Sequence, residues 1–179
     1  MSSRRVHIAL LAALALSLLW RGVPPAESAE VLAAQEVGVS ARHIATVLVS
    51  VNPLLSPAQQ DRIGRAVLRS SREHGLDPQL VTAIILVESG ARPWVRSPKG
   101  AVGLMQVMPY MAEPLGLAGN LVTIEHNVEA GCQILADNIR RLGEEDGISA
   151  YFWGSRIRGV AYLDRVQAAR ATVRRRLDS

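Results

Sequence analysis

The amino-acid sequence predicts an all-α protein with one compact main domain. Apolar residues recur at helical spacing in several segments, which are bounded by capping residues or prolines at their starts and by glycines at their ends. The sequence shows no strand-like alternation, internal repeat or low-complexity stretch that would compete with this interpretation. The chain has 179 residues, and 49% of them are apolar, which is enough to bury a sizeable core.

The N-terminal segment has the features of a secretory signal peptide. Arg4 and Arg5 precede an apolar run over residues 8–20, and small residues follow near positions 26 and 28. At about 13 residues the run is short for a membrane span, so we expect export; an uncleaved N-terminal anchor is the alternative. The expected organisation is a signal peptide at 1–28, an N-terminal helical extension at 29–55 and the main helical domain at 56–179.

Local signals place the helices along the rest of the chain. The first should end at Asn52, since the residue before a proline disfavours helical geometry. Ser56 begins a capping box for the second, and Gly75 ends it. Gly143 stops a later amphipathic helix. Helices are expected at residues 29–52, 57–74, 78–89, 127–142, 148–153 and 160–177, with a short apolar helix after a loop rich in glycine and proline that follows residue 90.

The helix at residues 78–89 should be buried in the middle of the domain. Asp77 supplies an N-cap acceptor, Pro78 suits the first helical position and Gly90 closes the apolar run. Almost no polar face remains between these signals, which is typical of a helix enclosed by others. Glu88 is the one charged residue in this segment.

Glu88 is the candidate for acid–base chemistry. It lies one turn after Ile84 and Ile85, so its side chain projects from an apolar stripe, and in the last turn the helix carbonyls disfavour a carboxylate. Both effects raise its pKa, and a carboxylic acid that stays protonated near pH 7 can cleave a glycosidic bond as a general acid. The alternative is a charged helix end that turns into water.

The residues that follow Glu88 carry a family resemblance. The motif elements, in order, are Glu88-Ser89, the nine-residue step to Ser97, Gly103-Leu104-Met105-Gln106, and Ala150-Tyr151 with Gly154. This ordered set, which spans roughly residues 60 to 170, resembles the soluble lytic transglycosylase (SLT-type) family. The resemblance implies a lysozyme-like, all-α fold of the goose-type lysozyme and SLT kind, and cleavage of the MurNAc–GlcNAc β-1,4 bond of peptidoglycan.

The resemblance also implies roles for the matching positions. Glu88 would be the catalytic acid, and the hydroxyl of Tyr151 would reach it; from local pattern alone, Tyr151 would instead be a core residue. Ser97 would lie near the sugar and the acid, although its local pattern is that of a turn residue. Gln106 and Met108 would line the cleft. The other supporting residues are Ser89, Tyr162 and Gly103, the last of which would let the backbone pass close to substrate or a neighbouring helix.

Two positions depart from the family pattern. Phe152 stands where the family motif Ala-Tyr-Asn-x-Gly has its asparagine, and Arg158 stands where a glutamate often occurs, four residues before Tyr162. These changes affect the expected sugar contacts and leave the acid and its neighbours in place.

A single carboxylate favours one mechanism over its rivals. Hydrolysis by paired carboxylates needs a second acidic side chain that faces the first across the glycosidic bond. Glu113, Glu125 and Glu129 lie on a polar loop or helix, so none of them is expected to be this partner. The resemblance then implies a lytic transglycosylase in which Glu88 acts as acid and then as base, leaving 1,6-anhydromuramoyl ends. The alternatives are a muramidase that uses water, as goose-type lysozymes do, and a non-catalytic peptidoglycan-binding assembly protein.

The sequence indicates neither a metal site nor a cofactor. The four histidines, His7, His43, His74 and His126, lack ligand spacing, and the glycines form no phosphate loop. Cys132, the single cysteine, should be an inert core residue. The net charge of +4 does not call for nucleic acid. We expect a monomer in the periplasm or cell envelope that binds peptidoglycan glycan strands, with a secretion or motility assembly as a candidate partner.

Overall fold

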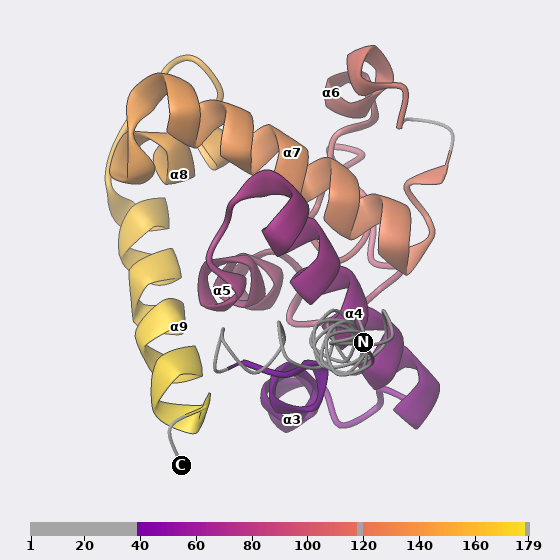
Figure 1. Ribbon diagram of the computed structural model, residues 1–179. Coiled ribbons are helices and arrows are strands. Elements are labelled where there is room, and N and C mark those ends of the chain that lie inside the picture. The colour runs from indigo at the N-terminus through magenta and orange to yellow at the C-terminus, as the bar shows by residue number, and fades with distance from the viewer. Residues whose placement is uncertain (1–38, 118–119, 178–179) are drawn as a thin grey trace, which may run out of the picture. The chain divides into compact units, whose positions relative to one another are not determined.

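The computed structural model describes residues 39–117 and 120–177, which fold into a set of packed helices (Figure 1). No strand occurs in these two ranges, whose sheet-like pairing consists of isolated bridges. The predicted all-α class is therefore confirmed for the described residues. The elements are α3 (Ala41–Val51), α4 (Pro57–His74), α5 (Pro78–Ser89), α6 (Pro109–Ala112), the 3-10 helix η1 (Glu113–Leu115), α7 (Ile124–Leu142), α8 (Glu144–Trp153) and α9 (Ala161–Leu177).

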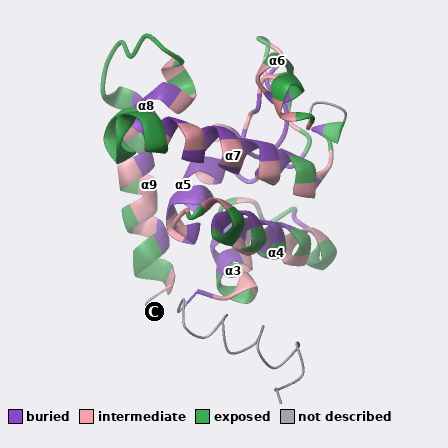
Figure 2. Cartoon of the chain, turned by 45° about the horizontal axis from the view of Figure 1, so that its top comes forward, coloured by how far each residue is buried: buried purple, intermediate pink, exposed green. Residues whose placement is uncertain are grey.

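Helix α5 lies in the middle of these helices, with α9 on one side and α4 on the other (Figure 1). Most of its apolar residues, such as Ile84 and Ile85, are fully buried, and Leu86 and Val87 near its end are partly buried. Figure 2 shows buried residues gathered where the other helices enclose it. The carboxylate of Asp77 accepts a hydrogen bond from Gln79 N at 2.8 Å and caps the helix, while Gly90 ends it in a left-handed conformation. The predicted buried helix is confirmed.

Helix α7 packs on α4 and also on α8. The approach of α8 requires a glycine, because a Cβ atom on Gly147 would lie 2.6 Å from Ile139 Cα of α7. Cys132 is fully buried on α7, and burial raises the pKa of its thiol, as expected for an unreactive core cysteine. Within the described ranges, no helix combines the length and the apolar composition needed to cross a bilayer.

The N-terminal part of the chain is only partly described. Residues 1–38, which include the predicted signal peptide and the first part of the predicted N-terminal helix, lie outside the described residues. The side chain of Ser40 accepts a hydrogen bond from His43 N, so in the described part the helix begins after Ser40 and not earlier. Ile44 and Leu48 of α3 are buried in the same core as α4 and α5. The boundary between extension and main domain stays a prediction.

Two later helices begin earlier than the sequence predicts. Helix α7 begins at Ile124 and not at Asn127, because the hydroxyl of Thr123 accepts a backbone hydrogen bond and caps it. Helix α8 begins at Glu144 and not at Ile148, because its first turn carries three acidic residues that suit the positive end of the helix dipole. In both cases most residues of the first turn are polar, so apolar spacing does not reveal it.

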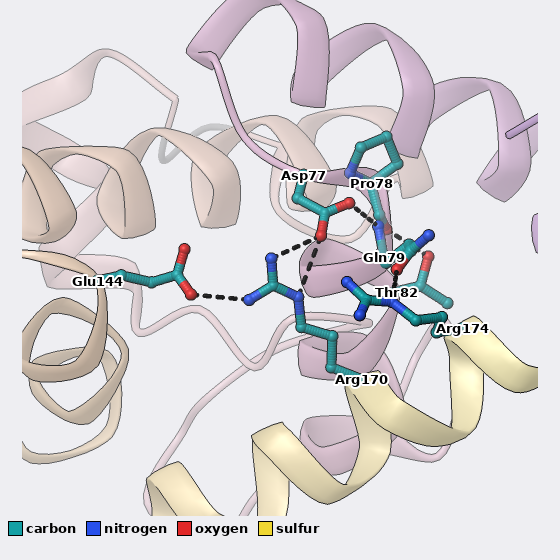
Figure 3. Close-up of polar contacts among 7 residues, drawn as sticks. All are labelled: Asp77, Pro78, Gln79, Thr82, Glu144, Arg170 and Arg174. Atoms are coloured by element: carbon teal, nitrogen blue, oxygen red, sulfur yellow. Dashed lines mark hydrogen bonds and ion pairs between the residues drawn. The ribbon is translucent and has the colours of Figure 1, made fainter. Parts of the chain in front are cut away.

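Arg170 connects α9 to the start of α5 and to α8 (Figure 3). Its guanidinium donates to Asp77 Oδ2 from Nε at 3.0 Å and from Nη2 at 2.6 Å, and to Glu144 Oε1 from Nη1 at 2.7 Å. Arg174, one turn later, donates to Gln79 at 3.4 Å. The side chain of Arg170 is only 19% exposed, so the contact between its guanidinium and the Asp77 carboxylate should be stronger than a surface ion pair. It adds a polar connection to the packing of α9 on α5.

Candidate active site

Glu88 lies in the last turn of α5 with its side chain half-buried. Its Oε1 accepts a hydrogen bond from the hydroxyl of Tyr162 at 2.6 Å. Burial is the largest influence and raises the pKa of the Glu88 carboxyl; the Tyr162 hydrogen bond and the charge of Arg165 lower it, and burial prevails. The direction of the shift agrees with the sequence prediction. This carboxyl therefore holds its proton at higher pH than an ordinary glutamate.

Tyr162 is the residue that touches the candidate acid. It lies at the start of α9, is 1% exposed, and reaches Glu88 because α9 packs along α5. Burial, followed by the nearby charge of Glu88, raises the pKa of its phenol far above the usual value, so the hydroxyl stays a donor throughout the working pH range. Oε1 of Glu88 therefore keeps a hydrogen-bond donor whether or not the carboxyl is ionised.

Tyr151 does not make the contact that the family resemblance implied. Its hydroxyl donates to the backbone oxygen of Met105 at 2.9 Å, whereas Tyr162 occupies the position on Glu88. The reason lies in packing: α8 directs Tyr151 toward the loop before α6, and α9 directs Tyr162 toward the acid. Burial, and then the charge of Glu88, raise the pKa of Tyr151, which therefore lies near the acid without bonding to it.

Ser97 and Gln106 hold the loop between α5 and α6 in shape. The Ser97 hydroxyl accepts from Ala101 N at 3.0 Å and closes a turn, in agreement with its local sequence pattern. The Gln106 amide donates to the backbone oxygens of Val95 at 3.1 Å and Gly103 at 2.9 Å. Gln106 also has a φ of 49°, which costs conformational energy in a residue other than glycine. Contacts of either side chain with sugar stay predictions.

Asn127, which sequence reasoning did not single out, anchors the same loop. From the first turns of α7 it accepts from Met105 N at 2.9 Å and donates to Val102 O at 2.8 Å and Leu121 O at 3.1 Å. Gly103 permits this approach, since a Cβ there would lie 2.5 Å from the Asn127 amide, and its φ is 77°. The close neighbour of Gly103 is thus a helix. The available sequence signal was an asparagine at the start of an apolar helix face, because a buried amide there needs hydrogen-bond partners.

Ser89 and Met108, two further residues predicted to support the site, lie in environments that differ from each other. Ser89 is 1% exposed and donates to Ile85 O at 3.0 Å, so its hydroxyl is satisfied inside α5. Its side chain therefore supports the helix end that carries Glu88. Met108 is half-buried at the start of α6, and its contact with a sugar ring stays a prediction.

The two departures from the family pattern lie on the α8–α9 side. Phe152 stacks on Tyr162, with ring centroids 4.9 Å apart and an interplanar angle of 14°. The guanidinium carbon of Arg165 lies 5.9 Å from the Phe152 centroid and 5.6 Å from that of Tyr162. Arg158 is exposed in the connection between the two helices. The ring in place of the family's asparagine thus packs on the tyrosine that bonds to Glu88.

The other acidic residues weighed from the sequence are engaged elsewhere. Glu125 pairs with Arg62 at 2.7 and 2.8 Å, and this pairing lowers its pKa to about 2. Burial raises the pKa of Glu129, but hydrogen bonds from Ser70 and His74, each 2.6 Å long, outweigh it and lower the value.

Glu113 is exposed on η1. The side chains that shift the pKa of Glu88 are Tyr162 and Arg165, and neither is a carboxylate. Across residues 39–117 and 120–177, no group of three or more histidine, cysteine or acidic side chains is arranged to hold a metal ion.

Residues 65–164 match the family model described as the transglycosylase SLT domain. The chain is 36% identical to a transglycosylase of Enterobacteria phage PRD1 over 87 residues, which cover 48% of this chain and 32% of that protein. It is 66% identical to the endo-type membrane-bound lytic murein transglycosylase A of Klebsiella pneumoniae subsp. pneumoniae over 35 residues, which cover 20% of this chain and 17% of the relative.

The chain also matches a solved structure, that of an inactive mutant of the lytic transglycosylase Slt from Pseudomonas aeruginosa, and the match covers 63% of this chain and 22% of that chain. The sequences are 22% identical and the TM-score is 0.45. The chain thus matches about a third or less of the length of these curated relatives.

Proposed function

This chain belongs to the transglycosylase SLT domain family, and from that premise we propose that it is a peptidoglycan lytic transglycosylase with Glu88 as its single acid and base. The observation that carries the proposal is the half-buried Glu88 carboxyl, hydrogen-bonded at 2.6 Å to a tyrosine that stays protonated. A protonated carboxyl on a rigid, buried helix has the properties that general-acid cleavage of a glycosidic bond requires.

The first step transfers the Glu88 proton to the glycosidic oxygen. The bond between this oxygen and the anomeric carbon of MurNAc breaks, and the acetamido oxygen of the same sugar bonds to that carbon. Glu88 is left as a carboxylate. The Tyr162 hydrogen bond strengthens as this charge develops, because a hydrogen bond to an ionised acceptor is stronger than a neutral one.

The second step uses the same side chain as a base. The 6-hydroxyl oxygen of MurNAc attacks the anomeric carbon and displaces the acetamido oxygen, while its proton passes to the Glu88 carboxylate. The acid is thereby regenerated and the product ends in 1,6-anhydromuramic acid. One carboxyl serves both steps, which agrees with the engagement of Glu125 and Glu129 elsewhere.

We also propose that the protein acts in the cell envelope, on peptidoglycan glycan strands. The Klebsiella relative is described as membrane-bound and as acting on murein, which supports this location and substrate. Export by the predicted N-terminal signal segment, action as a monomer, and service to a secretion or motility assembly are the finer parts of the proposal.

Mass spectrometry of muropeptides released from purified sacculi tests the function. The full chain should release products with 1,6-anhydromuramoyl ends. Glu88→Gln keeps the shape of the side chain and an acceptor for Tyr162 but cannot donate an acidic proton, so these products should disappear. Glu113→Gln makes the same chemical change at an exposed site and should leave product release unchanged.

The product ends separate the proposal from its alternatives. Reducing ends that depend on Glu88 would mean that water attacks, as in a muramidase, and would refute the second step. Binding to sacculi without any release by the unmodified chain would refute the enzyme and favour a peptidoglycan-binding protein.

A further inference from the structure

Resting on the proposed function, we propose that Phe152 and Arg165 are positioning residues, which form a stack with Tyr162 that holds its hydroxyl on Glu88 and places one positive charge beside the acid. The stack joins α8, which carries Phe152, to α9, which carries the other two residues. Neither side chain needs to contact the reacting atoms for this role.

Phe152 covers the ring of Tyr162. The two rings are nearly parallel, at 14°, with centroids 4.9 Å apart, and Trp153 meets the Phe152 ring edge-on at 5.0 Å. Phe152 is 50% exposed whereas Tyr162 is 1% exposed, which indicates that Phe152 shields the tyrosine from solvent. An asparagine, which the family motif has at this position, could not provide such a stack.

Arg165 extends the stack. It follows Tyr162 by three residues on α9, so the two side chains lie on the same face of the helix. Its guanidinium carbon lies 5.6 Å from the Tyr162 centroid and 5.9 Å from the Phe152 centroid, within the range of cation–π attraction. The exposed guanidinium is therefore held over the rings of Phe152 and Tyr162, and Tyr162 hydrogen-bonds to Glu88.

Arg165 is the group whose charge acts on the pKa of Glu88. The titratable groups that face Glu88 are Tyr162 and Arg165 from α9 and Tyr151 from α8. Both tyrosines stay neutral, because burial raises their pKa values far above the working range. Arg165 is thus the one charged member of this group, and its positive charge favours the carboxylate form that burial disfavours.

The charge of Arg165 determines the direction in which its removal should change the pKa of Glu88. Removing the positive charge should raise the pKa of Glu88 further, so that the acid keeps its proton to higher pH. The decline of activity on the alkaline side should then move upward, because cleavage needs the protonated form. Arg165→Lys keeps the charge and loses the planar stacking surface, so it should restore the pH range even if the rate falls.

The test combines a direct titration with an activity profile. Carbon-13 NMR of the full chain, with glutamate labelled at the side-chain carboxyl and Glu88 assigned by its loss in Glu88→Gln, gives the titration midpoint. The initial rate of muropeptide release at excess sacculi gives the activity profile. Both are measured for the unmodified chain and for Arg165→Gln and Arg165→Lys.

Arg175→Gln is the matched control for this test. It lies about 15 Å further along the same helix at roughly 1.5 Å per residue, beyond the Debye length of about 8 Å at physiological salt, and its guanidinium donates to Thr172.

A second pair of variants tests the ring. Phe152→Ala removes the stack and should lower the rate roughly 10- to 100-fold through misplacement of the acid. Phe152→Tyr retains an aromatic ring and should stay within about 2-fold of the unmodified rate, because ring stacking is largely preserved. Thermal melting of each variant separates a loss of positioning from a loss of fold.

In Arg165→Gln, we expect the titration midpoint of Glu88 and the pH at which activity declines on the alkaline side to rise together. In Arg165→Lys and Arg175→Gln, both should stay unchanged. An unmoved midpoint in Arg165→Gln, an equal shift in Arg175→Gln, or a full rate in folded Phe152→Ala would overturn the proposal. A midpoint shift in a chain that releases no muropeptides would support the stack and refute the proposed function.

Discussion

The hydroxyl of Tyr162 should contribute measurably to the rate of cleavage, and Tyr162→Phe removes it while keeping the ring. The hydroxyl donates to Glu88 Oε1 over 2.6 Å, so the variant leaves that oxygen without its donor. The stack with Phe152 needs only the ring and should survive. The change therefore isolates one hydrogen bond on the proposed acid.

The size of the effect follows from how this hydrogen bond changes during the reaction. Before proton transfer it joins neutral groups and contributes about 0.5–1.5 kcal/mol, and afterwards it joins a neutral donor to a carboxylate and contributes about 1.5–3 kcal/mol. Only the difference, roughly 1 kcal/mol, stabilises the transition state over the ground state. The rate should fall about 5- to 10-fold.

The assay is the initial rate of anhydromuropeptide release at excess purified sacculi, with Tyr151→Phe as the matched control. That variant also loses a phenol hydroxyl, but its partner is Met105 O. It should lower the free energy of unfolding by about 1 kcal/mol and leave the rate within about 2-fold. An unchanged rate in Tyr162→Phe, or a larger loss in Tyr151→Phe, would refute the assignment of Tyr162 as the residue that supports the acid.

Three further predictions concern stability. The raised pKa of Glu88 means that the folded state binds its proton more tightly than the unfolded state, so this group's contribution is present below the unfolded pKa and lost as pH rises through the folded pKa. Glu88→Gln should therefore be more stable than the unmodified chain at pH 8 in urea titrations and lose that advantage at pH 4; equal differences at both would contradict the buried-acid interpretation. Asn127→Ala breaks three hydrogen bonds, two of them to the active-site loop and one to Leu121 O, and should cost about 3 kcal/mol at roughly 1 kcal/mol each; urea midpoints check this, and a cost below 1 kcal/mol would speak against the anchor. Arg170→Met breaks the contacts with Asp77 and Glu144 and should cost about 1–3 kcal/mol, because it leaves a partly buried carboxylate without its partner; calorimetry at low and high salt measures it, and no loss would show that the contact does not hold α9.

Helix positions could be predicted where the signal was local. The capping box at Ser56 and the Asp77 cap mark helix starts through hydrogen bonds to residues two or three positions later, so the pattern and the structure report the same interaction. The starts of α7 and α8 were predicted too late, because their first turns are mostly polar and the prediction relied on apolar spacing. Local patterns therefore locate helices well and their polar first turns poorly.

The candidate site also has features that could be predicted from the sequence and features that could not. The raised pKa of Glu88 could be predicted because its cause, an apolar helix around a single carboxyl, is contained in twelve consecutive residues. The anchor role of Asn127 could not, since it joins α7 to a loop more than twenty residues away in the chain. The partner of Glu88 was also predicted wrongly, as Tyr151 in place of Tyr162.

The sequence by itself determined the helical class, the buried central helix and the acid that this helix carries, because each depends on residues within a few turns of one another. The tertiary structure decided which tyrosine bonds to that acid, and which aromatic ring and cation, Phe152 and Arg165, pack on that tyrosine. That choice depends on how α9 packs along α5, held by Arg170 on Asp77, and Glu88 and Tyr162 lie 74 residues apart in the chain. Neighbours so distant in sequence are selected by packing, which no local pattern records.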